Sequence, residues 1–210
     1  MGKASSGAIL RVAVTGGIGS GKTLVCSLFA KYGIPVLSAD EIAKDMMQSD
    51  KALRSELSAL LGSSTYLVDG SLNRAYVAGK IFSDKSLKQK VNRLVHPKVE
   101  AGIDSWFVAM EHSGEAIGIV EAALIYEAGY DKRLDVVLVI DVPESVRIER
   151  VVARDGSSVD DVKKRIAAQA PAEQKAKKAD YVIHNAGSFS ELETSVQFLV
   201  RILQSISKKQ

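Results

Sequence analysis

Five short apolar runs alternate with longer segments of helical periodicity along the chain. The runs are rich in β-branched residues, and most are continuously apolar, which is typical of parallel strands buried on both faces of a sheet. Helical segments between consecutive runs indicate crossover connections. The pattern therefore predicts an α/β fold with a parallel five-stranded sheet. The expected strands are RVAV at 11–14, PVLS at 35–38, AIGIV at 116–120, DVVLVI at 135–140 and DYVIH at 180–184.

The stretch between the second and third runs has no strand pattern and is mostly helical. Its helical patterns cover residues 51–62, 75–84, 86–95 and 97–112. Proline is well tolerated at the first position of a helix, so the pair His96-Pro97 predicts that one helix ends and another begins there. We interpret the stretch as a helical insertion at 43–113 in a core made of 8–42 and 114–205, after a disordered leader at 1–7.

A glycine-rich loop follows the first apolar run. The segment VTGGIGSGKTLV satisfies the pattern G-x-x-x-x-G-K-[ST] with Gly16, Gly21, Lys22 and Thr23. Behind it, apolar residues at i, i+4 spacing indicate a helix, and Gly33 supplies a stop at its C-terminal end. This strand–loop–helix context is the one that a phosphate-binding P-loop requires. The core is therefore predicted to bind a nucleoside triphosphate.

The composition of the loop explains how it would hold phosphate. Successive backbone N–H groups and the N-terminus of the following helix donate to phosphate oxygens, and side chains in place of the glycines would hold the backbone away. Lys22 can reach the β- and γ-phosphate oxygens, and the Thr23 hydroxyl can bind Mg²⁺. The nucleotide-binding residues expected here are Gly17, Ile18, Gly19, Ser20, Gly21, Lys22, Thr23 and Leu24.

Composition and charge narrow the class of protein. The net charge is only +3, and no basic block is interleaved with aromatic residues, so we expect no nucleic-acid partner. No apolar run reaches transmembrane length and the N-terminus lacks a signal-peptide core, so we expect no membrane partner. The single cysteine, Cys26, fits a reducing compartment. We expect a cytoplasmic protein that is a monomer or a weak homo-oligomer.

A P-loop by itself is compatible with switches, motors and kinases. A GTPase switch reads guanine with an N-K-x-D segment, and the chain contains none. A small-molecule kinase needs an acceptor site, an acid or base near the acceptor hydroxyl, and mobile basic groups that close over the phosphates. The chain offers candidates for all three, which favours a kinase. A nucleotide-dependent binding or switch module is the alternative from another class.

Asp40 is the candidate acid or base. Ser38 and Glu41 are spaced as a capping box, which places Asp40 in the first turn of a helix. There it could complement the helix dipole, an effect of about 0.3–1 kcal/mol. It could instead accept the proton of an acceptor hydroxyl, because ligands of open α/β sheets bind beyond the carboxyl ends of the strands. The spacing leaves both interpretations open.

Residues 146–170 are the candidate lid. Arg147, Arg150 and Arg154 share one face of a predicted helix, and Arg165 follows on a second short helix. Guanidinium groups on two jointed helices can clamp a transferring phosphoryl group. The alternative is a solvated arginine face, which is the usual explanation for such charge rows. The triphosphate site in the same chain favours the lid.

Two acidic residues end predicted strands. Glu121 follows AIGIV and Asp141 follows DVVLVI. Either could lie near the magnesium ion or its waters, and either could be an ordinary turn residue.

Eight segments in chain order resemble the dephospho-CoA kinase family, and together they span nearly the whole chain. The P-loop is the most specific of them. The segments are TGGIGSGK (15–22), ADEIAKD (39–45), GSLNRAYVAGKIFSD (70–84), RLVHPKV (93–99), ALIYE (123–127), RVVARDG (150–156), RIAAQ (165–169) and KKADYVIHNAGS (177–188).

The resemblance implies a P-loop kinase with a helical acceptor insertion and a lid, which uses ATP and Mg²⁺. The expected reaction is phosphorylation of the ribose 3′-hydroxyl of dephospho-CoA to give CoA. By the same resemblance, Asp40 orients or deprotonates that hydroxyl and Lys22 stabilises the transferring phosphoryl group. Arg150 and Arg154 clamp this group from the lid. The other residues implied are Arg74, His96 and Glu127 on the acceptor side and Asn185 near adenine.

The chain departs from the usual family pattern at two places. Ser38 stands where the family usually has Asp, and Glu121-Ala122-Ala123 stands where it has D-x-P. The second departure leaves the role of that loop toward magnesium open. His96 could line the acceptor site or simply cap a neighbouring carbonyl. The alternative within the kinase class is an enzyme for another small hydroxyl compound or a nucleoside monophosphate.

Overall fold

The structure is a computed structural model that describes residues 8–209, apart from the side chains at positions 82 and 83. The predicted leader, residues 1–7, lies outside the described residues. The chain divides into two compact units, one of Ala39–Ser105 and one of the segments before and after it. The predicted insertion, 43–113, begins and ends a few residues later than the observed unit, Ala39–Ser105. The second boundary falls inside helix α5 (Lys85–His112), so helical periodicity cannot mark it.

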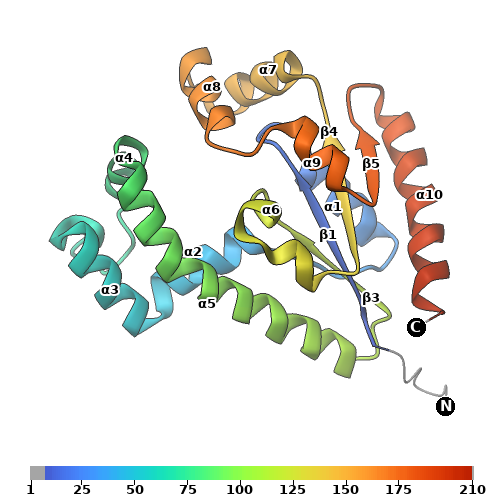
Figure 1. Ribbon diagram of the computed structural model, residues 1–210, viewed down its shortest axis with the longest axis horizontal. Coiled ribbons are helices and arrows are strands. Elements are labelled where there is room, and N and C mark those ends of the chain that lie inside the picture. Colours follow the sequence, from blue (N-terminus) through green and yellow to red (C-terminus); the bar gives the residue numbers. More distant parts are fainter. Residues whose placement is uncertain (1–7, 210) are drawn as a thin grey trace. The chain divides into compact units, whose positions relative to one another are not determined.

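The unit that carries the P-loop is built on a five-stranded sheet in the order β2-β3-β1-β4-β5 (Figure 1). All pairings are parallel, and the central strand β1 places Val14 opposite Glu121 of β3 and Leu138 of β4. The predicted α/β fold with a parallel sheet is confirmed, and each strand overlaps its apolar run. The strands are β1 (Leu10–Gly16), β2 (Val36–Ser38), β3 (Ile117–Glu121), β4 (Val136–Asp141) and β5 (Tyr181–His184).

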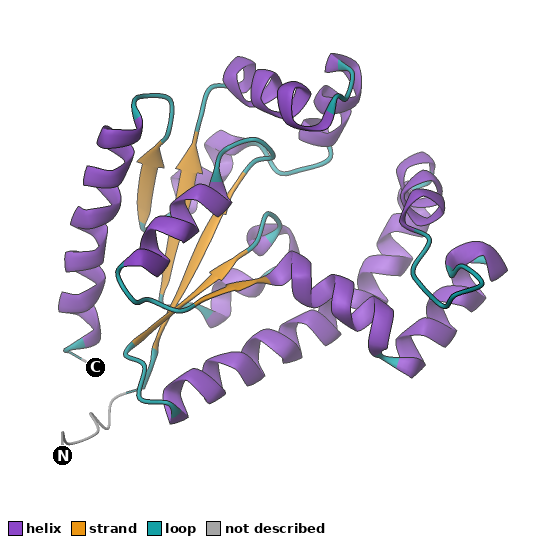
Figure 2. Ribbon diagram, turned by 180° about the vertical axis from the view of Figure 1, so that it is seen from behind, coloured by secondary structure: helices purple, strands orange, loops and turns teal. Residues whose placement is uncertain are grey.

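Helices lie on both faces of this sheet (Figure 2). Helices α1 and α10 bury apolar side chains such as Phe29 and Val196 against Val12 of β1. The last turns of α5 bring Phe107 against Gly118 of β3, and α9 packs against β4. The remaining elements of the unit are α1 (Lys22–Lys31), α6 (Ile125–Ala128), η2 (Tyr130–Arg133), α7 (Glu144–Asp155), α8 (Val159–Ala167), α9 (Ala172–Lys178) and α10 (Phe189–Ser207).

Helix α1 ends at the predicted glycine stop. Gly33 has a φ of 77°, in the left-handed region that favours glycine. Its N–H donates to the carbonyl of Ala30 over 3.0 Å, and the N–H of Ile34 donates to Phe29 over 3.4 Å. This pair of bonds is a Schellman motif, which satisfies carbonyls left over at the helix end.

The Ala39–Ser105 unit is helical, as predicted, and has its own apolar core. Leu53, Leu57 and Leu61 of α3 are buried against Val91 and Val95 of α5. The i, i+4 spacing of these residues places them on one face of each helix, which is why the helices pair. The helices are α2 (Ala39–Ser49), α3 (Lys51–Leu61), η1 (Ser63–Thr65), α4 (Arg74–Ser83) and the greater part of α5.

Helix α5 runs unbroken through Pro97, so the prediction that one helix ends at His96 and another begins there is wrong. An internal proline lacks a donor and crowds the carbonyl four residues earlier, which costs about 3 kcal/mol. Apolar side chains at i, i+4 spacing continue across it, including the buried Val95 and Ile103. Each such buried side chain stabilises the fold by about 1.5–3 kcal/mol, so the packing outweighs the local cost.

Candidate active site

The P-loop joins the end of β1 to the start of α1. Residues 17–21 connect Gly16, the last residue of β1, with Lys22, the first of α1. Gly21 has a φ of 89°, and a Cβ at this position would collide with the side-chain amide of Asn185. Glycine is therefore required here for its backbone conformation and for the space it leaves.

Lys22 folds back across the P-loop. Its Nζ lies 3.2 Å from the carbonyl oxygen of Gly16 and 3.2 Å from that of Gly17. The N-terminus of α1 carries a partial positive charge at the same point, and its first N–H groups have no partner within the helix. The ammonium and the helix terminus together make this loop suited to an anion.

A hydrogen bond joins the first turn of α1 to the end of β3. The Thr23 hydroxyl donates to Glu121 Oε1 over 2.8 Å. Asp141, at the end of β4, instead lies 3.4 Å from Nδ1 of His184 on the neighbouring strand. Of the two acidic strand ends that the sequence left open, Glu121 is the one in contact with the P-loop threonine.

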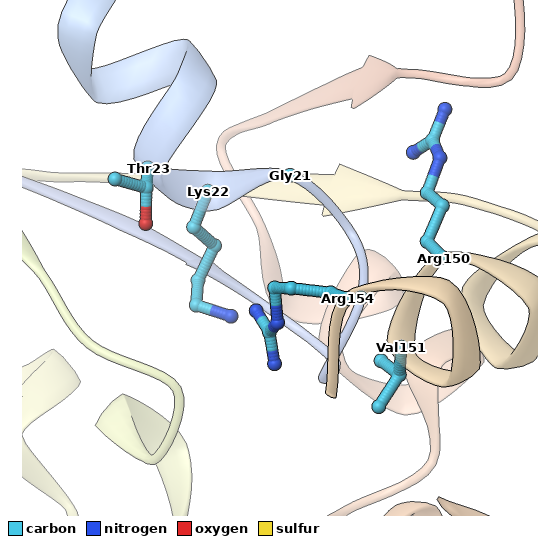
Figure 3. Close-up of a pocket in the computed structure, with 7 residues that line it drawn as sticks. Gly21, Lys22, Thr23, Arg150, Val151 and Arg154 are labelled. Atoms are coloured by element: carbon cyan, nitrogen blue, oxygen red, sulfur yellow. The ribbon is translucent and has the colours of Figure 1, made fainter. Parts of the chain in front are cut away.

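A pocket of about 190 Å³ lies between the P-loop and helix α7 (Figure 3). Lys22 and Arg154 extend toward each other into it, whereas Arg150 points away (Figure 3). The fold therefore brings together basic residues that are far apart in the sequence. The lining residues are Gly19, Gly21, Lys22, Thr23, Arg150, Val151 and Arg154.

Arg147 does not lie on a solvated face of α7. Its side chain is buried, and its Nε donates to the carbonyl of Val142 over 3.2 Å. A Cβ built at Gly17 would lie 2.5 Å from Arg147 Nη1, so the guanidinium packs directly against the P-loop. The interpretation of these arginines as a solvated row is therefore wrong at Arg147.

Arg150 and Asn185 connect α7, the loop after β5 and the P-loop. Arg150 Nη2 donates to the carbonyl of Asn185 over 2.9 Å. The buried Asn185 side chain donates through Nδ2 to the carbonyl of Ser20 over 2.8 Å. These two bonds fix the loop after β5 beside the P-loop, where the predicted adenine-side residue lies.

The end of α7 and the following α8 hold two arginines on one carboxylate. Arg154 Nε lies 2.7 Å and Arg165 Nη1 3.1 Å from the carboxylate of Asp155. The hydrogen bond from Arg154 is the main reason why the pKa of Asp155 is held below its ordinary value. The Arg154 side chain is 64% exposed, whereas the side chain of Asp155 is 27% exposed.

Gln169 contacts the P-loop, and motif reasoning did not include it among the site residues. Its Oε1 accepts from the backbone N–H of Ile18 over 3.0 Å. The only sequence signal for this contact is that Gln169 closes the family-like segment RIAAQ.

Glu127 is predicted to bind the acceptor, and in the structure its carboxylate contacts other residues of the protein. Its Oε1 lies 2.8 Å from Nζ of Lys175 and accepts from the N–H of Ala170 over 2.8 Å. Burial opposes ionisation of Glu127, but the bonds from Lys175 and Ala170 outweigh it and hold the pKa of this carboxyl below its ordinary value.

The other predicted acceptor-side residues belong to the Ala39–Ser105 unit. Asp40 is exposed in the first turn of α2, as the sequence predicts. Arg74 is exposed at the start of α4, directly after the N-cap Asn73. His96 is half-buried within α5, and burial lowers its pKa, an effect that the charge of Glu100 partly offsets.

Comparison with known proteins decides the family. The dephospho-CoA kinase family model matches residues 10–191, most of the chain. The chain belongs to the dephospho-CoA kinase family. This family catalyses the final, ATP-dependent step of CoA biosynthesis.

Individual members of the dephospho-CoA kinase family are similar over nearly their full length. The dephospho-CoA kinase of Syntrophotalea carbinolica is 34% identical over 192 residues, which cover 91% of each chain. That of Chlorobaculum tepidum is 35% identical over 201 residues, 94% of this chain and 96% of its own. The solved dephospho-CoA kinase of Campylobacter jejuni is 27% identical, with a TM-score of 0.68 over 94% of this chain and 97% of its own.

Among residues 8–209, none of the helices of this dephospho-CoA kinase family member is both long and apolar enough to cross a bilayer.

Proposed function

We propose that the protein transfers the γ-phosphoryl group of ATP to the ribose 3′-hydroxyl of dephospho-CoA. The observation that carries this proposal is the pocket in which Lys22 and Arg154 approach each other beside the P-loop, in a chain that belongs to the dephospho-CoA kinase family. Phosphoryl transfer needs mainly positioning and charge stabilisation, and basic groups on both sides of a phosphate supply both.

The phosphates of ATP would bind in the P-loop. The backbone N–H groups of residues 17–24 would donate to phosphate oxygens, together with the N-terminus of α1. In this structure the Lys22 ammonium donates to the neutral carbonyl groups of Gly16 and Gly17, and phosphate oxygens would hold it more strongly. Asn185, fixed beside Ser20, would contribute to the adenine side.

Magnesium would bind at Thr23. Mg²⁺ prefers oxygen ligands and keeps several waters, and the Thr23 hydroxyl with the adjacent Glu121 carboxylate offers such a donor set. When bound, the ion would neutralise charge that develops on the β- and γ-phosphate oxygens. Glu121 has the acidic character of the family's Asp at this position, which supports a role toward the ion or its waters.

Arg154 would clamp the transferring group from the lid, and Arg150, whose side chain points away from the pocket toward Asn185 in this structure (Figure 3), would join it only by turning inward. The largely exposed Arg154 is bound to the partly exposed carboxylate of Asp155 and can exchange this partner for phosphate when the lid closes. Arg150 lines the pocket while it holds Asn185, so it would link lid closure to the adenine side.

The acceptor would be oriented by residues of the helical unit. Asp40 is an exposed carboxylate at a helix start that directly follows strand β2, which suits a group that accepts the proton of the 3′-hydroxyl. Arg74 and His96 would bind other parts of the dephospho-CoA molecule. Glu127 is less suited to direct substrate contact, because its carboxylate already binds Lys175 and Ala170.

We also propose that the protein works in the cytoplasm as a monomer or a weak homo-oligomer. A single buried cysteine, Cys26, suits a reducing compartment.

The test is product identification with a panel of acceptors. The purified protein is incubated with ATP and Mg²⁺ and, separately, with dephospho-CoA, adenosine, a nucleoside monophosphate or shikimate, and the products are analysed by mass spectrometry. We expect a phosphorylated product only with dephospho-CoA, and we expect that product to be CoA, with the new phosphate on the ribose 3′-oxygen. A product with a different acceptor, or ADP alone with every acceptor, would contradict the proposal.

A further inference from the structure

We propose that the buried Lys175 and its partner Glu127 form a latch that positions the two loops in contact with the P-loop and thereby strengthens ATP binding. This proposal rests on the ATP site proposed above. Neither residue belongs to the P-loop or to the lid helices α7 and α8, so both would act as positioning residues.

The latch is centred on the ammonium group of Lys175. Only 1% of the Lys175 side chain is exposed. Its Nζ lies 2.8 Å from Glu127 Oε1 and donates to the carbonyl of Ala123 over 2.7 Å. A buried charge is costly unless it is paired and hydrogen-bonded, so these two bonds fix Lys175 and hold its partners in place.

The first loop held by the latch follows β3. Ala123 accepts the bond from Lys175 and stands two residues after Glu121. Glu121 in turn accepts the hydrogen bond from the Thr23 hydroxyl over 2.8 Å. Lys175 thus restrains the short segment that presents Glu121 to the P-loop.

The second loop held by the latch follows α8. Glu127 accepts the N–H of Ala170 over 2.8 Å, and the adjacent Gln169 accepts the N–H of Ile18 over 3.0 Å. Glu127 therefore fixes the backbone from which Gln169 reaches the P-loop. Both chains of contacts end on predicted nucleotide-binding residues, Thr23 and Ile18.

We expect loss of the latch to weaken ATP binding and not merely to lower the stability of the fold. A loop that is already held in its binding conformation loses less freedom when the ligand binds. Removing the ammonium of Lys175 would leave Glu127 half-buried without its cation and release both loops. The cost would appear in ATP binding, while the affinity for dephospho-CoA would change less.

The test compares Lys175→Met with Lys177→Met. Lys177 lies on the same helix, is 72% exposed and pairs with Glu173, so it controls for the loss of a lysine from α9. ATP dissociation constants are measured by calorimetry, and the KM values for ATP and dephospho-CoA are measured in steady state. We expect Lys175→Met to raise the ATP dissociation constant and the KM for ATP roughly tenfold, and Lys177→Met to change neither.

A second variant tests the same connection while the Lys175–Glu127 pair stays intact. Gln169→Ala removes the contact with Ile18, and we expect a comparable rise in the ATP dissociation constant. If Lys175 acts through Gln169, the double variant will bind ATP about as weakly as the weaker single variant.

Unchanged ATP binding in Gln169→Ala would overturn the proposal. So would a Lys175→Met protein that only melts at a lower temperature and binds ATP as well as Lys177→Met does. A wild-type protein that binds no ATP would instead refute the proposed function, and the latch with it.

Discussion

Arg154 and Asp155 are neighbours in sequence and partners in the lid, and their bond is suited to exchange. The pair lies at the end of α7, and the Arg154 side chain is largely exposed. Exposed ion pairs contribute little to stability because water screens them. A phosphoryl group with several negative charges is a stronger partner, so the exchange favours the bound nucleotide.

We predict that Arg154→Ala lowers kcat by about 10²–10³-fold, because one donor to the developing phosphoryl charge is lost. The melting temperature should change little, because the side chain is exposed. Steady-state kinetics and thermal melting of the variant and the wild type provide the measurement. A kcat equal to that of the wild type would show that Arg154 is an ordinary solvated residue.

The ends of β3 and β4 offer a matched pair of carboxylates for a magnesium test. Glu121→Gln should raise the Mg²⁺ concentration needed for half-maximal activity, because Glu121 contacts Thr23. Asp141→Asn should leave it unchanged, because Asp141 lies beside His184 instead. The measurement is the activity of the two variants as a function of Mg²⁺ concentration. A larger rise in the Mg²⁺ requirement for Asp141→Asn than for Glu121→Gln would contradict our assignment.

The half-buried His96 should make the folding stability of the protein depend on pH in the acid range. Its pKa in the folded protein is lowered below 6.5, first by burial, so the unfolded chain binds more protons than the folded one just below that pH. The stability that neutral His96 contributes is present above pH 6.5 and is lost as the pH falls through the lowered folded value. Denaturant unfolding of wild type and His96→Gln between about pH 5 and pH 8 should show a weaker acid loss in the variant. Identical pH profiles would contradict this.

At the scale of elements, the P-loop and the end of α1 use left-handed glycines in different ways. Gly21 has a φ of 89° with the Asn185 amide where a Cβ would stand, whereas Gly33 has a φ of 77° with open space around it. The first position is constrained by conformation and by packing, and the second by conformation alone.

We predict that Gly33→Ala costs about 1–2 kcal/mol of stability through its backbone conformation and leaves ATP affinity unchanged. Gly21→Ala should cost at least as much and also weaken ATP binding strongly, because Asn185 must move away from Ser20. Denaturant unfolding and ATP calorimetry on both variants make the comparison. Equal ATP affinities would show that the Gly21–Asn185 contact does not shape the site.

Most elements could be predicted from the sequence because they depend on local pattern. In the strands and helices, the spacing of apolar residues indicates which faces are buried. The segment Gly16–Thr23 specifies a P-loop through its local sequence pattern. The unbroken α5 could not be predicted, because the packing of Val95 and Ile103 decides whether Pro97 ends the helix. A local rule for proline has no access to that packing.

At the scale of the whole molecule, the sequence predicts which charged residues line the site. It does not predict which distant residues form hydrogen bonds that position the loops of the site. Asn185 meets Ser20 across 165 positions, and Gln169 meets Ile18 across 151. Such contacts depend on the strand order β1-β4-β5 and on the packing of α7 and α9, which no local pattern encodes. Lys175 lies in a lysine-rich helix and differs from the neighbouring lysines only in being buried, which the sequence does not show.

The most direct test of the central claim is CoA formation by Lys22→Ala and Lys31→Ala, measured side by side with the wild type. Both lysines lie on α1, but Lys22 crosses the P-loop whereas Lys31 is exposed at the far end of the helix. We predict that Lys22→Ala lowers the rate of CoA formation from ATP and dephospho-CoA by about 10³-fold, and that Lys31→Ala forms CoA at the wild-type rate. CoA formation by Lys22→Ala at the wild-type rate would contradict the assignment of phosphoryl transfer to this P-loop.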